Sequence, residues 1–579
     1  MVETNDLYKT KIKEQFRDTT KIEVFLHLID DIDTSGLSID YSNKDFFSGD
    51  MAEYAKFSQD GYATLEKDWF KVDGSRYVAS ENNNGIDRYT SVLEQAVSVV
   101  EFSFDTPQTL SGLVFYFVNS YPLTIYIDIT YSTEETETFT CYPNDIIYRY
   151  ENTMKDCISL YIRVVNEEDK RTRLNYIEFG TLDIFNEQNL ISSRLDLDID
   201  LISTELPQDN LCLSVYDFEG RYHPDIPGSR WDMLTERQKA EVYYGFEDNM
   251  FQRNILYLNK NIHYENHKLE INFSNALYFQ SQIFNRGYYP SSPVLLTDIL
   301  REVQDDFNMF LVTLIETPLG YIEETTLNPL PKCSVKEAVQ LIANARQACL
   351  YENQDGFLIL NSMYIGTSTV DYLTQKDELQ LPLCEIHNQL KNVIVNYYNY
   401  IAEDEILLFE VTEEFTDDTE KTYKIEYDNK KDVRYELTVL SGTAIVNDSF
   451  LGAHLSEITV NTTTANDTVS YKLSVYGKNT SEIKQQFVLP VNTDGEDCII
   501  SNPLISNEGH ASRVAQWIAR FYSENKSYEF PFVQDYSLQL TDGVDFDTDL
   551  NERAHGIITK IQFNTPGLSG AIKIRKRGD

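Results

Sequence analysis

The chain has 579 residues, of which 42% are apolar and 13% aromatic, and its 93 acidic and 49 basic residues give a formal net charge of −44. This length is too great for one hydrophobic core and predicts about three to five domains. The negative charge disfavours nucleic-acid binding through a basic surface, because such a chain repels phosphate backbones.

The N-terminal residues 1–16 contain no apolar core of signal-peptide length, and no apolar run approaches the roughly 18 residues of a membrane span. We therefore expect neither signal-peptide secretion nor a membrane-spanning segment. The seven cysteines are odd in number, far apart and without a CxxC pair. This pattern favours reduced, mostly packed thiols in a cytoplasm.

Runs of Tyr, Val and Ile alternate with polar residues through most of the chain, as in antiparallel sandwiches and barrels. The first run is KIEVFLHLID at 21–30. Six runs between 97 and 178, joined by turn clusters such as DTPQTLSG, predict one compact β domain of about 120 residues. Strands return at 402–492, and the C-terminus predicts a hairpin that turns at Pro566-Gly567 and has a basic last strand.

Three segments have helical periodicity. The first follows Pro293 and carries an apolar stripe, which comprises Val294, Leu295, Ile299, Leu300, Val303 and Phe307. The second begins with Ser334 as N-cap and Glu337 as its capping-box partner. The third, GHASRVAQWIARFYSE, places Val514, Trp517, Ile518 and Phe521 on one face. We expect these helices to cover small α+β pieces.

The segment RLDLDIDL alternates Leu195, Leu197, Ile199 and Leu201 with Asp196, Asp198 and Asp200. A strand would bury the four apolar side chains and project the three carboxylates from its other face. Same-face side chains lie about 7 Å apart along a strand, too far for three carboxylates to share one small cation. The spacing favours a solvated or lumen-facing strand over a metal site.

Other candidate sites are weaker. Asp545, Asp547 and Asp549 have calcium-loop spacing, but Leu550 and Gly556 replace the required glycine and glutamate, so we expect a loop between strands. We expect His510 to be an ordinary residue near a helix start. The sequence has no zinc, nucleophile-elbow or phosphate-loop motif. We therefore assign no catalytic, cofactor-binding or metal residues and no cofactor.

Five segments in order resemble the tail-hub proteins of tailed bacteriophages and prophages of Gram-positive hosts. They are GYATLEKDWFKVDGSRYVAS (61–80), LISTELPQDNLCLSVYDFEGRYHPD with LTERQKAEVYYGFED (201–248), LPKCSVKEAVQLIANARQACLYENQDGFLIL (330–360), LKNVIVNYYNY (390–400) and ISNPLISNEGHASRVAQWIARFY (500–522). Each is a weak motif alone, and together they span most of the chain.

The resemblance implies a mainly β, multidomain fold with minor α+β, in which two tube-like barrels, an inserted discoidin-like jelly roll and a small helical domain follow one another. Its second barrel would begin at LKNVIVNYYNY and be completed by the final hairpin. The implied domains are 1–60 and 185–290 for the first barrel, 61–184 for the inserted β-sandwich, 291–388 for the α+β domain, 389–500 for the second barrel, and 501–579 for a helix and closing hairpin.

The same resemblance implies a non-enzymatic virion protein of the tail tip or baseplate, assembled in the host cytoplasm. It would form a homotrimer that closes the tail tube, adapts sixfold to threefold symmetry and gates passage of DNA and the tape-measure protein. Its implied partners are distal tail or tail-tube ring proteins and receptor-binding or fibre proteins, with DNA only in transit. An acidic lumen would keep phosphate from sticking during ejection.

Two alternatives stay open. A cell-surface carbohydrate-binding protein could act through the 61–184 β-sandwich, although no loop aromatics stand out there. An enzyme that degrades cell-wall polymer is the other, and the sequence supplies no distinctive acid pair for it. Many relatives continue into a peptidase or a receptor-binding tail, whereas this chain stops after IKIRKRGD. We therefore expect wall lysis and receptor binding to reside in other proteins.

Overall fold

A computed structural model shows a mostly β chain. Its contacts divide it into unit 1 (Met1–Glu23, Asn186–Phe218 and Glu241–Asp579) and unit 2 (Val24–Phe185 and Glu219–Ala240). No helix in the described part is long and apolar enough to cross a membrane. The structure describes residues 4, 6–12, 20–30, 32, 37–40, 62–63, 71–72, 76–78, 99–117, 121–165, 172–246, 249–304, 313–316, 323–361, 369–373, 377–463, 468–522, 524–548 and 552–576.

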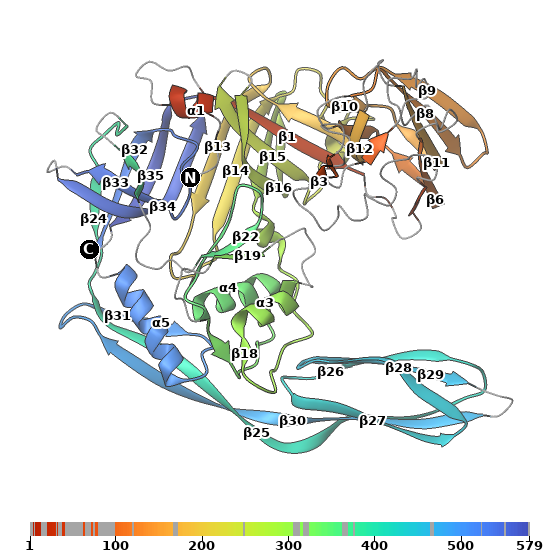
Figure 1. Ribbon diagram of the computed structural model, residues 1–579, viewed down its shortest axis with the longest axis vertical. Helices are drawn as coiled ribbons and strands as arrows, with labels where there is room; N and C mark the ends of the chain where they lie inside the picture. The colour runs from red at the N-terminus through yellow and green to blue at the C-terminus, as the bar shows by residue number, and fades with distance from the viewer. Residues whose placement is uncertain are drawn as a thin grey trace. The chain divides into compact units, whose positions relative to one another are not determined.

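Unit 2 contains two β-sheets whose apolar faces meet. One sheet has the strand order β2-β6-β11-β8-β9. In the other sheet the order is β10-β7-β12, followed by the unit 2 part of β1. Figure 1 labels β6, β8, β9 and β11 of the first sheet and β10 and β12 of the second. Apolar side chains from both sheets share one buried core, which includes Phe102, Phe104, Leu113, Phe115, Ile127, Ile129, Leu160 and Ile162. All six predicted runs are strands. The bounds are β1 Lys21–Ile29, β2 Leu37–Asp40, β6 Val99–Leu110, β7 Leu113–Phe117, β8 Thr124–Tyr131, β9 Thr136–Cys141, β10 Ile147–Tyr150, β11 Met154–Val165 and β12 Thr172–Phe185.

The prediction of a turn at DTPQTLSG is wrong for most of this segment, because strand β6 continues through it to Leu110. The pairing of β6 with β11 shifts register on both sides of Cys157. Such bulge-like irregularities let a strand carry residues that do not fit a regular ladder. Of segment 61–80 the structure describes three short strands, β3 (Tyr62–Ala63), β4 (Lys71–Val72) and β5 (Arg76–Val78), and the rest lies outside the described residues.

The main sheet of unit 1 runs β15-β16-β17-β14-β13-β34-β35-β32-β24. Antiparallel pairing of β13 with β34 sets Asp198 opposite Lys560 and joins an early group of strands to the C-terminal group. No sheet in the described residues closes into a barrel, so the β-rich multidomain class is confirmed without its barrels. The bounds are β13 Leu190–Asp198, β14 Gln208–Tyr216, β15 Lys239–Phe246, β16 Asn249–Glu265, β17 Lys268–Ser274, β24 Leu383–Ile386, β32 Lys526–Val533, β33 Gly543–Asp547, β34 Arg553–Thr565 and β35 Ser569–Lys576.

The predicted final hairpin is confirmed, and its partners differ from expectation. Strand β35 pairs with β32 and β34 pairs with β13, so the hairpin extends the main sheet. Strand β25 (Leu390–Phe415), which contains LKNVIVNYYNY, pairs instead with β30 (Val469–Pro490) and β31 (Glu496–Ser501). Alternate apolar residues on β13 and β34, such as Leu195 and Phe563, are both fully buried, which gives these two strands a common core face.

A small α+β part of unit 1 holds two of the predicted helices. Helix α4 (Val335–Ala345) begins at Ser334 with the predicted capping box. Helix α3 (Leu296–Gln304) begins later than expected, because Val294 and Leu295 form the short strand β18 with β20 (Thr325–Thr326). Phe307 lies outside the described residues. The other strands of this part are β19 Thr313–Glu316, β21 Cys349–Glu352 and β22 Leu358–Asn361. Strand β23 (Thr369–Leu373) instead pairs with β33 of the main sheet.

The third predicted helix, α5 (Glu508–Phe521), packs on strands β25 and β30 of unit 1 (Figure 1). Its residues Val514, Trp517 and Ile518 join α3 and α4 in one hydrophobic core with Val393 and Val395 of β25. Phe521 packs on the edge of this core. The predicted apolar faces of all three helices therefore meet in a single cluster.

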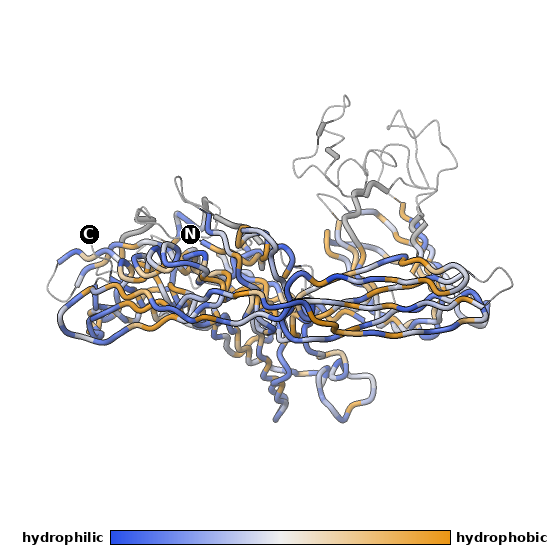
Figure 2. The backbone as a smooth tube through the Cα atoms, turned by 90° about the horizontal axis from the view of Figure 1, so that it is seen from below, coloured by the Kyte–Doolittle hydropathy of each residue, from blue (hydrophilic) through white to orange (hydrophobic). Residues whose placement is uncertain are grey.

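Strands β25 and β30 are 26 and 22 residues long and extend as an antiparallel ribbon beyond this core. Three more strands, β26 (Glu420–Glu426), β28 (Thr443–Leu451) and β29 (Leu455–Thr463), form a second sheet over the ribbon and β27 (Lys431–Ser441). A separate core between these sheets includes Ile425, Ile458, Val460, Tyr471 and Leu473. Figure 2 shows apolar and polar residues interspersed along these strands, as expected for a sandwich with one solvated face on each sheet.

All seven cysteines are free thiols in the structure. Cys141, Cys157 and Cys349 are buried, whereas Cys212 is exposed. Burial raises the pKa of Cys157 to about 11 and that of Cys333 to about 12. Both thiols therefore stay protonated at neutral pH and are weak nucleophiles.

Candidate functional site

A hollow of about 620 Å³ opens in unit 1 beside the C-terminal strands. Its volume is in the range of small-molecule sites. Two of the three aspartates of RLDLDIDL, Asp198 and Asp200, line it together with charged residues from the other end of the chain. Those charged residues are Glu496, Glu529, Lys560, Lys573 and Arg575, and His387 lines the hollow as well.

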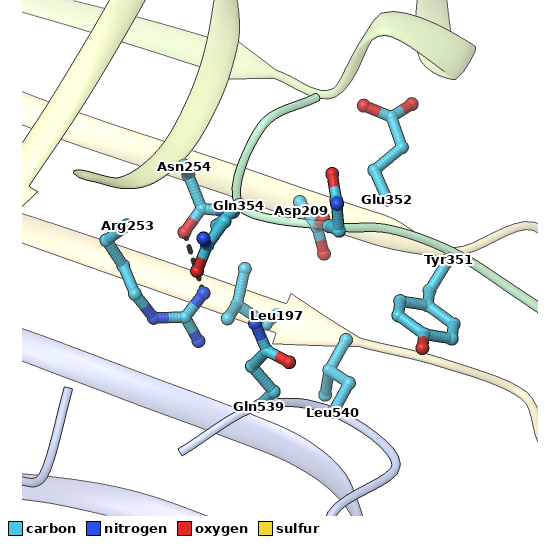
Figure 3. A pocket seen from close by; sticks show the side chains of 10 residues that line it. Leu197, Asp209, Arg253, Asn254, Tyr351, Glu352, Gln354, Gln539 and Leu540 are labelled. Atoms are coloured by element: carbon cyan, nitrogen blue, oxygen red, sulfur yellow. Dashed lines mark hydrogen bonds between the residues drawn. The ribbon is translucent and has the colours of Figure 1, made fainter. Parts of the chain in front are cut away.

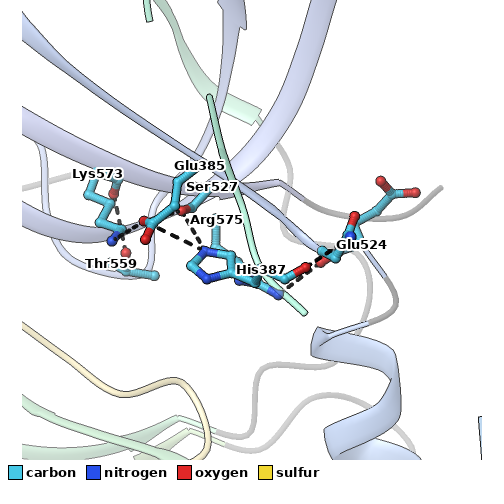
Figure 4. A network of polar contacts seen from close by, with 8 residues as sticks. Glu385, His387, Glu524, Ser527, Thr559, Lys573 and Arg575 are labelled. Carbon is cyan, nitrogen blue, oxygen red and sulfur yellow. Dashed lines mark hydrogen bonds and ion pairs between the residues drawn. The ribbon is translucent and has the colours of Figure 1, made fainter. Parts of the chain in front are cut away.

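A polar network joins the edge strand β24 to β32 and β35 at this hollow (Figure 4). Glu385 accepts hydrogen bonds from Lys573 Nζ at 2.8 Å and from Ser527 Oγ at 3.2 Å. The ion pair with Lys573 holds the pKa of Glu385 below its usual range. Each of the three strands contributes one polar side chain, so the network ties the edge strand to the sheet.

His387 follows β24 and lies 2.7 Å from Ser527 Oγ through its Nε2 atom. Burial and the nearby cations Arg575 and Lys573 lower the pKa of His387, so the ring is neutral at neutral pH. In a nucleophilic triad the carboxylate binds the second ring nitrogen, Nδ1. Here Glu385 lies 3.8 Å from the same Nε2 that faces the serine. The arrangement therefore suits a strand-joining network better than nucleophilic catalysis.

Arg575 also lines the hollow. Its guanidinium lies 4.8 Å from the centre of the Tyr522 ring and donates a 2.9 Å hydrogen bond to the Glu524 carbonyl. Burial lowers the pKa of Arg575 and raises that of Tyr522. The stacking connects the basic last strand to the end of helix α5.

The four apolar residues of RLDLDIDL, from Leu195 to Leu201, are buried as predicted. The three aspartates are half-buried, and each has a different partner. Asp196 pairs with Arg194 at 2.7 Å, and Asp198 pairs with Lys560 at 3.1 Å. Asp200 accepts hydrogen bonds from the Ile202, Thr204 and Glu205 amides and so caps the turn after β13. The predicted strand is confirmed as far as Asp198, whereas Ile199, Asp200 and Leu201 lie beyond its end. The three carboxylates share no common partner.

The predicted loop at Asp545 and Asp547 is wrong, because both residues lie on strand β33. Phe546 between them is fully buried, which fits a strand that alternates inward and outward residues. Asp545 pairs with Arg553 at 2.7 Å and with His555 Nδ1 at 2.8 Å. Asp549 lies outside the described residues. In the described part no three His, Cys, Asp or Glu side chains are grouped to hold a metal ion.

His510 lies in the first turn of α5 and is buried, as an ordinary helix residue can be. Its Nε2 atom is 2.7 Å from the Ala345 carbonyl at the end of α4. Burial lowers its pKa, so the neutral ring donates this hydrogen bond. The residue joins two helices of the core.

Sequence reasoning missed the hollow and the polar network. Glu385, Ser527 and Lys573 come from three strands that are separate in the chain, His387 follows the first of them, and no local spacing connects the four. The one available signal was the basic last strand IKIRKRGD, which is unusual in a chain with so large a negative charge. Its Lys573 and Arg575 do line the hollow.

No protein-family model and no curated protein matches the chain. Among solved structures, a 43 kDa tail protein of prophage MuSo2 from Shewanella oneidensis is 11% identical, with a TM-score of 0.37, and the match covers 68% of this chain and 94% of that one. A tail protein from Neisseria meningitidis MC58 is 10% identical, with a TM-score of 0.38 and coverages of 69% and 94%. Prophage tail protein gp18 from Listeria monocytogenes EGD-e is 8% identical, with a TM-score of 0.37 and coverages of 69% and 91%. At these values the similarities do not assign the chain to a family.

Proposed function

We propose that this chain is a structural tail-hub protein of a bacteriophage or prophage, located at the tail tip or baseplate. The observation that carries the proposal is the pairing of β13 with β34 in unit 1. It places an early group of strands (β13, β14, β17) beside a late group (β34, β35, β32) in one sheet. A chain that occupies two neighbouring positions of a ring needs two groups of strands that lie side by side, one for each position. The order of the five hub-like sequence segments supports the same function.

In this proposal three copies form a ring with two similar strand groups each. Six such groups match a sixfold tail tube on one side, while the three chains offer threefold symmetry on the other. Closure into tube-like barrels is then a property of the assembled trimer. The partners are the distal tail or tail-tube ring, the tape-measure protein and receptor-binding or fibre proteins.

In a tail hub, the large negative charge of the chain would assist the passage of DNA. DNA and the tape-measure protein pass through the hub, and a lumen lined by carboxylates repels phosphate. Replacing lumen acids with lysine should slow DNA ejection at low salt and restore it at high salt, because screening weakens the new attraction. Ejection kinetics that do not change would count against an acidic lumen.

The chain enters unit 2 at Val24 and returns to unit 1 at Asn186, with a further excursion at Glu219–Ala240. This path suits a β-sandwich inserted into the hub, with a structural or adaptor role. The second candidate function is carbohydrate binding through the same sandwich. The exposed Tyr121 and Tyr142 of unit 2 favour testing it, because aromatic rings can stack on sugars.

Two measurements test the proposal. The purified protein should have a mass near three times 67.1 kDa, and labelled copies should appear at the tail tip in electron micrographs of particles. A monomer that is absent from particles would refute the hub. Glycan-array binding by the whole chain, lost on Tyr142→Ala, would support the carbohydrate alternative. Clearing of host cell walls in zymograms would instead indicate an enzyme.

A further inference from the structure

A second polar site lies in unit 1, between strands β14 and β16 and the turn that follows β21 (Figure 3). Asp209 of β14, Arg253 of β16 and Gln354 of the turn between β21 and β22 line a void of about 10 Å³. This is roughly the space that one water molecule needs. Asp209 and Arg253 are each 2% exposed.

Three buried polar atoms at this void have no hydrogen-bond partner among the described residues. They are Asp209 Oδ1, Arg253 Nε and Gln354 Oε1. The outer nitrogens of Arg253 are used elsewhere, since Nη1 donates to Asn254 Oδ1 at 3.2 Å and Nη2 donates to the Leu538 carbonyl at 2.8 Å. Buried polar atoms are rarely left unsatisfied, because desolvation without a partner is costly.

The electrostatics point in the same direction. Burial raises the pKa of Asp209 and lowers that of Arg253, because desolvation disfavours the charged form of each group. Their mutual attraction opposes both shifts. A small polar molecule between them would satisfy the unpaired atoms without requiring direct contact.

We propose that one ordered water molecule occupies this void and bridges Arg253, Asp209 and Gln354. The water accepts a hydrogen bond from Arg253 Nε and donates to Asp209 Oδ1 and Gln354 Oε1. This pattern of one donor and two acceptors matches water and disfavours a metal cation, which the neighbouring guanidinium would repel. The bridge joins the main sheet to the α+β part through groups on three separate chain segments.

A crystal structure of the whole chain, at a resolution that shows ordered water, tests this directly. We expect a single peak within hydrogen-bond distance of the three atoms. An empty void, a direct contact between Arg253 and Asp209, or a peak with the anomalous signal of a metal ion would each overturn the proposal.

Solution measurements give an independent test through oxygen-17 relaxation dispersion, which counts long-lived internal waters. The double variant Asp209→Leu with Arg253→Met should lose one such water relative to the wild-type protein. A matched control, Asp198→Leu with Lys560→Met, removes a half-exposed ion pair of the same strand region and should lose none. An unchanged count in a folded double variant would refute the site. If that variant does not fold, the wild-type crystal structure decides.

Discussion

Arg513 of helix α5 binds the buried carboxylate of Glu324 with both arms, through Nε to Oε1 at 2.5 Å and Nη2 to Oε2 at 2.6 Å. Glu324 is 3% exposed and also accepts a hydrogen bond from Gln347 at 2.9 Å. Bidentate pairs of this kind are among the strongest polar contacts in proteins. The pair fixes α5 to the segment before β20.

Replacing Arg513 with alanine should lower the free energy of unfolding by about 2 kcal/mol, because Glu324 is left charged in the interior. The loss is smaller than for a fully buried pair, since the Arg513 side chain is 47% exposed. Arg301→Ala, which removes an exposed ion pair with Asp298, is the control and should cost less than about 0.5 kcal/mol. Urea unfolding measures both, and equal losses would contradict the assigned role.

The aspartates of β13 should respond differently to the same substitution. Asp200→Asn should cost about 1 to 2 kcal/mol, because the carboxylate accepts hydrogen bonds from three turn amides. Asp198→Asn breaks only a half-exposed pair with Lys560 and should change stability by less than about 0.5 kcal/mol. Thermal unfolding of the two variants side by side checks this order. A reversed order would show that the turn does not depend on Asp200.

Glu352 predicts a dependence of stability on pH. Burial raises its pKa from 4.5 to about 7, although the Ala276 and Leu277 amides donate to it. Between these two values the folded protein holds a proton that the unfolded chain has released. The free energy of unfolding should therefore fall by about 3 kcal/mol as pH rises from 4.5 to 7, and this contribution should be constant above that.

Glu352→Gln should remove this fall, because the amide does not titrate. Urea unfolding at several pH values from about 4.5 to 7.5 measures it. The free energy of unfolding of this variant should still decrease somewhat with rising pH, since the pKa of Glu378 is also raised to about 7. Glu378→Gln is the matched variant, and the two reductions should add because the sites share no contacts in the described residues. A wild-type curve in which stability rises through this window would contradict the prediction.

The capping box of α4 gives a prediction based on local structure. Ser334→Ala removes the Oγ atom that accepts from the Glu337 amide and donates to the Glu337 carboxylate. We expect a loss of about 1 kcal/mol in the free energy of unfolding. Ser449→Ala on the exposed face of β28 should be neutral within about 0.5 kcal/mol. The comparison by chemical unfolding tests the cap, and a neutral Ser334→Ala would contradict it.

Local patterns predicted local structure well. The alternation that begins at Leu195 identified a strand, although the strand ends at Asp198 and not at Leu201. Ser334 with Glu337 identified a helix start, because both patterns depend only on neighbouring residues. The strand at Asp545 was missed for two reasons. Its aspartates have the spacing of a calcium loop, and it has only two inward apolar residues, Val544 and Phe546, which is too short an alternation to indicate a strand. The pairing of β13 with β34 and the hollow beside them depend on contacts between distant segments, which spacing does not encode.

That same pairing governs the order in which the protein can fold. Strand β13 leaves the ribosome long before β34 is made, so one edge of the growing sheet stays unpaired through most of synthesis. An unpaired strand edge is a template for aggregation, and charged side chains are a common protection against it. Asp196 and Asp198 belong to β13 and so lie at this unpaired edge. Until Lys560 of β34 is made, Asp198 lacks its ion-pair partner, and a bare charge at this edge would disfavour pairing between nascent chains.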